Sequence, residues 1–234
     1  MVRSYLAAAA ILAFGSALPA KAQNDPYYDR KDPERVIIGL DMSASNPLVE
    51  DREYARKVGM RVASRLGQLS VKSEVLIRPL GVYNSTTNDS LRMDIVVSAK
   101  NRPEDLAMKV EQLIAGIPDF VASGKLAAEG YTNILAFLEN MSQTVDCGSL
   151  KTTYILVSDG LEDSQYTALR QVDAALPLDV LRVDGEKCDE LQILGVGRGV
   201  ASPQETKRIR DAWQVWAVDS DGAPFKKFFG LNDW

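Results

Sequence analysis

Apolar strand-like segments and amphipathic helix-like segments alternate along most of this 234-residue chain, and this alternation limits the fold more than any other feature. The strand-like segments are residues 35–40, 73–82, 93–100, 152–160 and 190–197. The segments with helical spacing or helix start signals are residues 47–69, 102–117, 132–145, 164–176 and 202–218. The alternation predicts one α/β domain with a doubly wound, mostly parallel sheet that carries helices on both faces.

Composition excludes several classes of function. The sequence contains no histidine, which excludes histidine-based catalytic triads, histidine metal sites and histidine proton relays. Lys and Arg number 27 and Asp and Glu number 32, so the net charge is −5. Because the chain also lacks a large basic cluster, we expect no binding to nucleic acid.

The first 22 residues have the features of an export signal. Arg3 supplies a positive start, residues 6–20 form an apolar core, and an AKA tripeptide supplies small residues for cleavage. The apolar run is too short and too broken for a convincing membrane span, although an uncleaved anchor is the alternative. We therefore expect a signal peptide at 1–22, a polar linker at 23–34, no membrane span in the mature chain, and a periplasmic or secreted protein.

Export changes how the two cysteines are interpreted. In an exported protein an even number of cysteines favours a disulfide. Cys147 precedes the strand-like segment 152–160 and Cys188 precedes the segment 190–197. These segments are expected to be neighbouring parallel strands, so both cysteines are expected at the same edge of the sheet. We predict a Cys147–Cys188 disulfide, and two buried free thiols are the alternative.

Oxygen-bearing side chains stand at three places that the predicted topology brings together. Asp41, Ser43 and Ser45 follow the first strand-like segment. Thr132 opens a helix, and Asp159 lies at the end of a later strand. Ligands of such sheets bind beyond the carboxyl ends of the strands. An all-oxygen set with two negative charges suits a hard divalent cation, which we expect to be Mg²⁺, with Mn²⁺ or Ca²⁺ as alternatives. Taken singly, the aspartates are typical turn residues and Thr132 is a typical helix N-cap.

This set resembles the metal-ion-dependent adhesion site of the von Willebrand factor A (vWA) domain family. The family pattern is Asp-x-Ser-x-Ser after the first strand, a threonine before a middle helix and an aspartate that ends the fourth strand. The residues that match it are Asp41, Ser43, Ser45, Thr132 and Asp159. The resemblance implies a Rossmann-like vWA domain at residues 35–218, with one short antiparallel edge strand. It further implies a non-enzymatic binding module in which an acidic side chain of a partner protein completes the cation's ligands.

The chain departs from the family pattern in the loop after the first strand. Many members have glycine and methionine where Ala44 and Asn46 stand here. The departure leaves the ligand positions intact. We expect Asn46, Pro47 and Gly160 to form a rim of the site that faces the partner.

The C-terminal segment, residues 219–234, follows the region of resemblance and is aromatic and locally basic. We expect Phe225, Phe228 and Phe229 to pack on the core. Contact with a membrane surface or with a partner is the alternative.

Other signals compete with the adhesion-site interpretation. The GVGRG stretch at residues 195–199 has Val200 where a dinucleotide-binding fingerprint requires glycine or alanine, so we interpret it as a strand ending. Ser43 would need a lysine base to act as a nucleophile, and neither site motif contains one. We expect Glu162 and Asp163 to be solvated charges at the start of a helix, rather than acids close to the ligands. A hydrolase that uses the same cation and a scaffold with a vestigial site are the alternative functions.

Overall fold

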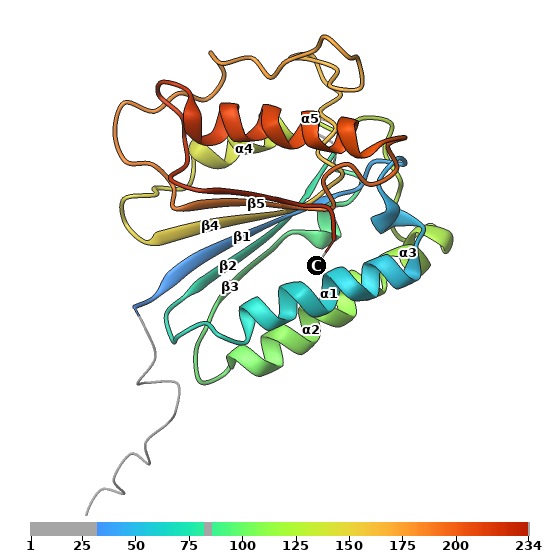
Figure 1. The fold of residues 1–234 in the computed structure, drawn as a ribbon. Coiled ribbons are helices and arrows are strands. Elements are labelled where there is room, and N and C mark those ends of the chain that lie inside the picture. The colour runs from blue at the N-terminus through green and yellow to red at the C-terminus, as the bar shows by residue number, and fades with distance from the viewer. Residues whose placement is uncertain (1–31, 82–85, 234) are drawn as a thin grey trace, which may run out of the picture.

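The structure, a computed structural model, describes residues 32–81 and 86–233 and consists of one sheet between two layers of helices (Figure 1). The predicted signal peptide and nearly all of the predicted linker lie outside these residues. Within the described ranges, no helix is both long and apolar enough to cross a membrane.

The sheet of the described residues has six strands. They are β1 (Glu34–Asp41), β2 (Glu74–Leu80), β3 (Met93–Val96), β4 (Lys151–Val157), β5 (Glu190–Leu194) and β6 (Phe228–Leu231). Their order is β3-β2-β1-β4-β5-β6, and only the β2–β3 pair is antiparallel in this sheet. The prediction of a doubly wound, mostly parallel sheet with one short antiparallel edge strand is therefore confirmed.

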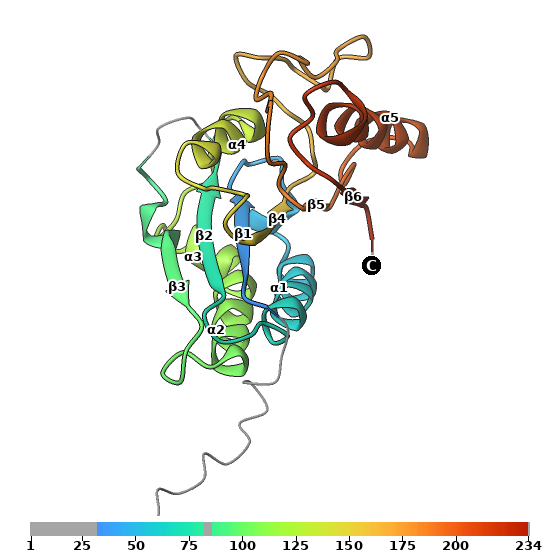
Figure 2. The same cartoon turned by 90° about the vertical axis from the view of Figure 1, so that its left-hand side faces the viewer.

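Helices cover both faces of the sheet. The helices α1 (Arg52–Leu66), α2 (Pro103–Ala115) and α3 (Ile117–Ala122) lie on one face, and α4 (Ile134–Ser142) and α5 (Pro203–Gln214) lie on the other (Figure 1 and Figure 2). A short 3₁₀ turn at Pro47–Val49 precedes α1, another at Asp89–Leu91 precedes β3, and a π turn at Val215–Asp219 follows α5.

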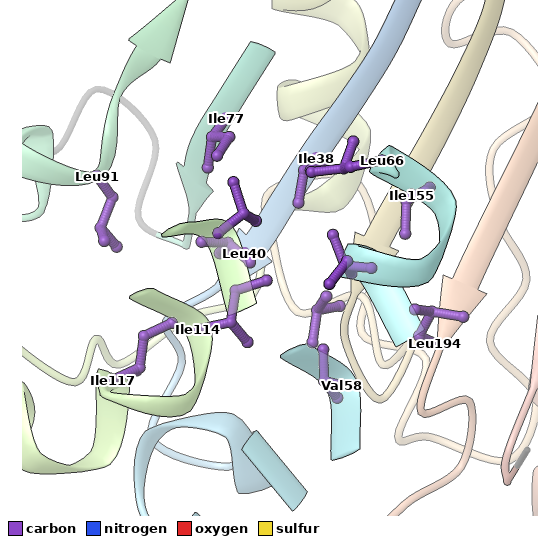
Figure 3. Packing of buried hydrophobic residues seen from close by; sticks show 14 of the residues in the cluster. Ile38, Leu40, Val58, Leu66, Ile77, Leu91, Ile114, Ile117, Ile155 and Leu194 are labelled. Atoms are coloured by element: carbon purple, nitrogen blue, oxygen red, sulfur yellow. The ribbon is translucent and has the colours of Figure 1, made fainter. Parts of the chain in front are cut away.

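Strand β1 contributes to the hydrophobic core on both sides of the sheet. Ile38 and Leu40 pack toward α1 and α2, where they meet Val58 and Ile114 (Figure 3). Ile37 packs toward α4 and α5. Side chains alternate between the two faces of a strand, so a strand that is buried on both faces has apolar residues at consecutive positions. This explains the continuous apolar sequence of β1.

The helix predicted at residues 164–176 is not formed. The segment instead consists of turns in the long connection between β4 and β5. Its backbone hydrogen bonds go elsewhere: the Ser164 N–H donates to the Thr167 carbonyl, and the Leu169 N–H donates to the Glu162 carbonyl. Leu169 is buried whereas Val172 is 79% exposed, so the apolar residues at helical spacing do not share a buried face.

The C-terminal segment belongs to the sheet. Strand β6 pairs in parallel with β5. Phe225 is buried and stacks edge-on against Tyr154, with ring centroids 5.3 Å apart, and Phe228 is partly buried against the same core. Phe229 is 45% exposed, so the expectation that it packs on the core was wrong. In β6 neighbouring side chains face opposite sides of the sheet, and Phe229 lies on the side away from Phe228.

The predicted Cys147–Cys188 disulfide is formed. It links the segments that lead into β4 and β5, which are neighbours in the sheet, so it lies at the edge opposite the ends of β1 and β4 that carry Asp41 and Asp159. Cys188 also exchanges backbone hydrogen bonds with Pro224 and Lys226. The disulfide therefore fixes the start of β5 to both β4 and the C-terminal segment.

We expect reduction of this disulfide to destabilise the domain. The bonded cysteines are 41 residues apart, for which the chain-entropy model gives about 4 kcal/mol. Mass spectrometry of the native, non-reduced protein should detect no alkylatable thiol. In urea unfolding, the Cys147→Ser/Cys188→Ser variant should have a free energy of unfolding lower than that of wild type by this amount. Two free thiols in the native protein would contradict the assignment.

Candidate functional site

The candidate residues gather where the strand order reverses, between β1 and β4. β1 and β4 are parallel neighbours, with Leu40 opposite Val157, so Asp41 and Ser158 leave the sheet side by side. β1 connects through α1 to β2 on one side, whereas β4 leads to β5 on the other. The crevice at such a switch point is where doubly wound sheets bind ligands.

Asp41 is fully buried at the end of β1. Its Oδ2 atom accepts a hydrogen bond from the Ser158 hydroxyl at 2.7 Å, and its Oδ1 atom accepts one from the Ser43 N–H at 2.9 Å. These bonds fix the carboxylate between the ends of β1 and β4. Ser158 was missed in the sequence analysis, although it directly precedes Asp159.

The two serines of the first loop lie together. The hydroxyl oxygens of Ser43 and Ser45 are 3.4 Å apart. Ser43 is 2% exposed, whereas Ser45 is exposed to solvent. One hydroxyl thus points into the buried part of the site and the other lies at its surface.

Asn46 does not form the exposed rim that we expected. It is 1% exposed, and its side-chain amide donates to the carbonyls of Asp41 at 2.9 Å and Val157 at 3.1 Å. Gly160 is also buried, and Pro47 is half-buried. The amide of Asn46 therefore joins the ends of β1 and β4 and holds the two aspartate-bearing loops together.

Asp159 follows β4 and is 1% exposed. Its Oδ1 atom accepts from the Leu161 N–H at 2.9 Å. Gly160 has a φ of +76°, a conformation that favours glycine, and this allows the chain to turn sharply after the aspartate. The Gly160 carbonyl accepts a hydrogen bond from the indole N–H of Trp213 in α5 at 2.8 Å. A core residue thus anchors the turn that carries Asp159.

Thr132 is 3% exposed and lies just before α4. Its carbonyl accepts from the Asp163 N–H at 2.8 Å, which places it beside the loop that follows Asp159. Thr132 is not the helix N-cap, because the side chain of Asn133 accepts from the Ala136 N–H at 3.1 Å and takes that role. Helix capping therefore does not explain the threonine.

Backbone pairing also joins the Thr132 loop to the first loop. The Glu129 N–H donates to the Met42 carbonyl, and the Ala44 N–H donates to the Glu129 carbonyl, both at 2.8 Å. All five sequence-predicted residues therefore lie on three loops that hydrogen bonds tie to one another.

The two aspartates of the site have pKa values well above the ordinary value of an aspartate. Burial raises the pKa of Asp41 to about 6, against the effect of hydrogen bonds from Ser158 and Ser43. Burial, followed by the nearby charge of Asp41, raises the pKa of Asp159 to about 7. Two buried carboxylates that repel each other favour a bound positive charge or a proton.

The donor set fits a cation that accepts hydroxyl ligands. Within the described residues, no group of three or more His, Cys, Asp or Glu side chains is placed to hold a metal. The candidate site has only two carboxylates, and hydroxyls supply its remaining oxygens. Such a set suits Mg²⁺, which keeps several waters and needs few protein carboxylates.

Glu162 lies beside the site, and our expectation that it is solvated was wrong. It is fully buried, and it accepts hydrogen bonds from the Ile134 and Leu135 N–H groups and from the Ser164 hydroxyl. Burial raises its pKa to about 7. Asp163 is exposed as expected. No local sequence signal marks Glu162, because its main partners are 27 and 28 residues away.

The GVGRG stretch, interpreted from the sequence as a strand ending, forms the turn that follows β5. The Gly197 N–H donates to the Asp159 carbonyl at 2.8 Å. A Cβ atom at Gly197 would lie 2.4 Å from the Thr206 hydroxyl, so close packing explains this glycine.

We expect the cation-free domain to lose stability as pH rises. The folded-state pKa values of Asp41 and Asp159, about 6 and 7, lie above the ordinary value of 3.8, so between about pH 4 and pH 7 the folded state binds more protons than the unfolded state. This contribution is present at pH 4, falls as pH rises through both values, and levels off above pH 7. Urea unfolding in chelator should give a lower midpoint at pH 8 than at pH 5, and the Asp41→Asn/Asp159→Asn variant should show a smaller difference. An equal or larger difference in the variant would contradict the assignment.

Comparisons with known proteins give similarities only to solved structures. No model of a known protein family matches the sequence, and no curated protein matches it. Among solved structures, the chain is similar to one described as von Willebrand factor type A from Catenulispora acidiphila, with 15% sequence identity and a TM-score of 0.41. The match covers 77% of this chain and 37% of that chain, so this chain spans little more than a third of the length of the solved one.

Proposed function

We propose that this chain is an exported, non-enzymatic binding module of the vWA type, which holds a divalent cation and recognises an acidic side chain of a partner protein. The observation that carries the proposal is the convergence of Asp41, Ser43, Ser45, Thr132 and Asp159 at the strand switch point. Three of these residues are hydroxyl donors or acceptors and two are carboxylates. Their order along the chain matches the adhesion-site pattern at every position.

The charge of the site supports a bound cation. Asp41 and Asp159 are buried, burial raises the pKa of both, and the charge of Asp41 further raises the pKa of Asp159, so the cation-free site at neutral pH carries unfavourable negative charge. Mg²⁺ is the proposed ion, with Mn²⁺ or Ca²⁺ as alternatives, and its chemistry would be to attract and orient an oxygen anion. The residues that would hold it are the three hydroxyl side chains and the two carboxylates.

The exposure of the site supports recognition of an external group. Ser45 is exposed, whereas the other four residues are buried beneath it, so the donor set opens to solvent at the first loop. Few protein carboxylates leave room for an outside ligand, as is usual for Mg²⁺. A partner aspartate or glutamate is the group that we propose completes the set.

Export is supported by the N-terminal sequence and by the disulfide. Residues 1–22 have the pattern of a signal peptide. The Cys147–Cys188 bond is of a kind that persists in oxidising compartments, such as the periplasm or the extracellular space. We therefore propose a periplasmic or secreted location.

The test is partner capture from the native envelope fraction, compared between Mg²⁺ and chelator. The same proteins should be captured in Mg²⁺, lost in chelator and recovered when Mg²⁺ is restored. Capture should also fail for Ser43→Ala and Thr132→Ala. The control is Ser149→Ala, an exposed hydroxyl just before β4 and therefore at the opposite edge of the sheet, which should capture normally. Equal capture in chelator and in Mg²⁺, or no capture by the unmodified chain, would contradict the proposal.

A further inference from the structure

The start of α4 is tied to the loop after β4 by three sets of hydrogen bonds. The Thr132 carbonyl accepts from the Asp163 N–H at 2.8 Å. The Asn133 amide donates to the Gln165 side chain at 2.8 Å. The Ile134 and Leu135 N–H groups donate to Oε2 of Glu162 at 2.8 and 3.2 Å. We call these contacts the 132–165 clamp.

Glu162 is the carboxyl group of the 132–165 clamp that accepts hydrogen bonds from the start of α4. Its other oxygen, Oε1, accepts from the Ser164 hydroxyl at 2.6 Å, and Ser164 in turn accepts from the Tyr166 N–H at 3.1 Å. The first N–H groups of a helix lack partners within the helix and carry partial positive charge, so a carboxylate binds them well. Each oxygen of this fully buried side chain is therefore engaged, one with α4 and one with its own loop.

Glu162 shares the capping of α4 with Asn133: Asn133 accepts from the Ala136 N–H, and Glu162 accepts from the Ile134 and Leu135 N–H groups. What Glu162 adds is a connection between two loops that are far apart in sequence: one holds Thr132 two residues before Ile134, and the other holds Asp159 three residues before Glu162. The distance between the Thr132 hydroxyl and the Asp159 carboxylate depends on how these loops are held.

We propose that Glu162 is a positioning residue that sets Thr132 against Asp159 and thereby raises the affinity of the site for its cation. The inference rests on the proposed function, because it assigns Glu162 a role at the same site. Groups that orient metal ligands without touching the metal typically change metal affinity by about 10–100-fold when they are removed.

The test measures Mn²⁺ affinity by electron paramagnetic resonance at fixed pH, in four variants of the full exported chain. Glu162→Ala, which removes every contact, should weaken binding about tenfold or more. Ser164→Ala, which removes the Oε1 contact and the hydrogen bond from the Tyr166 N–H but keeps both contacts of Glu162 with α4, should weaken it less. Glu162→Gln should bind within about threefold of wild type, because its amide oxygen can accept from α4 while its NH₂ donates to Ser164. Leu138→Ala is the stability control, because it removes a buried side chain of α4 that lies outside the clamp and should leave the affinity unchanged.

A second readout needs no metal. In the cation-free protein, amide hydrogen exchange at Ile134 and Leu135 should speed up in Glu162→Ala and stay slow in Glu162→Gln. If exchange responds in this way while Mn²⁺ affinity does not change, the positioning role is wrong and the proposed function stands. If Leu138→Ala weakens binding as much as Glu162→Ala does, the role of Glu162 is only structural. If wild type binds no Mn²⁺, the proposed function fails and this inference fails with it.

Discussion

Replacing Asp159 with alanine is expected to abolish cation binding and to leave the cation-free domain as stable as wild type or slightly more stable. The charged form of this buried carboxylate is unfavourable, since burial and the charge of Asp41 raise its pKa to about 7. Removing it eliminates that repulsion, at the cost of one hydrogen bond to the Leu161 N–H. The same change removes one of two carboxylates from the donor set, so we expect Mn²⁺ affinity to fall at least about 100-fold, or about 2.7 kcal/mol.

Thermal unfolding at pH 8, with and without Mn²⁺, measures both effects of Asp159→Ala. Wild type should be stabilised by the ion and the variant should not, because only a protein that binds the ion gains from it. Asp211→Ala is the matched control, since this aspartate is exposed on α5 and pairs with Lys207. A large drop in the melting temperature of cation-free Asp159→Ala would mean that the residue is structural.

The Trp213→Ala variant is expected to show the largest loss of stability. Trp213 is fully buried between α5 and the sheet, and it stacks edge-on against Trp216 with ring centroids 5.5 Å apart. Truncation of a buried tryptophan to alanine typically costs about 3–5 kcal/mol. For a domain of this size the melting temperature should fall by about 6–20 °C, at about 2–4 °C per kcal/mol.

The conservative replacement Trp213→Phe separates packing from hydrogen bonding. Phenylalanine fills most of the space but leaves the Gly160 carbonyl without its indole donor. We expect the missing hydrogen bond to lower the free energy of unfolding by about 1–3 kcal/mol. Trp216→Phe is the control, because the Trp216 indole N–H has no hydrogen-bond partner among the described residues. Urea unfolding should therefore show that Trp213→Phe is less stable than Trp216→Phe. The reverse order of stability would contradict the role given to the Gly160 contact.

The fold was predictable because its main determinants are local. Residues Val36–Leu40 form an uninterrupted apolar run, as expected of a strand buried on both faces. The start of α5 is also set locally, because Ser202 caps it through the Glu205 N–H and Pro203 is its first residue. The parallel order then followed from the alternation of strands and helices, and the meeting of Asp41 with Asp159 followed from the parallel order.

What the sequence did not reveal depends on partners that are distant along the chain. Asn46 is buried because its amide reaches the Val157 carbonyl, 111 residues away. Glu162 can be buried because two N–H groups of α4 donate hydrogen bonds to its side chain. The segment 164–176 is not helical because its N–H groups find carbonyls outside a helical pattern, which the spacing of Leu169 and Val172 does not indicate. Export, cation binding and the identity of the cation remain predictions.

The most direct test of the central claim is a Mn²⁺ titration of the purified wild-type protein at pH 7.5, followed by electron paramagnetic resonance. We expect one saturable site per chain, displaced by Mg²⁺ and lost in Asp41→Ala and in the Ser43→Ala/Thr132→Ala variant. Ser149→Ala should bind like wild type. The absence of saturable binding by wild type, or equal binding by wild type and Asp41→Ala, would contradict a cation site at the ends of β1 and β4.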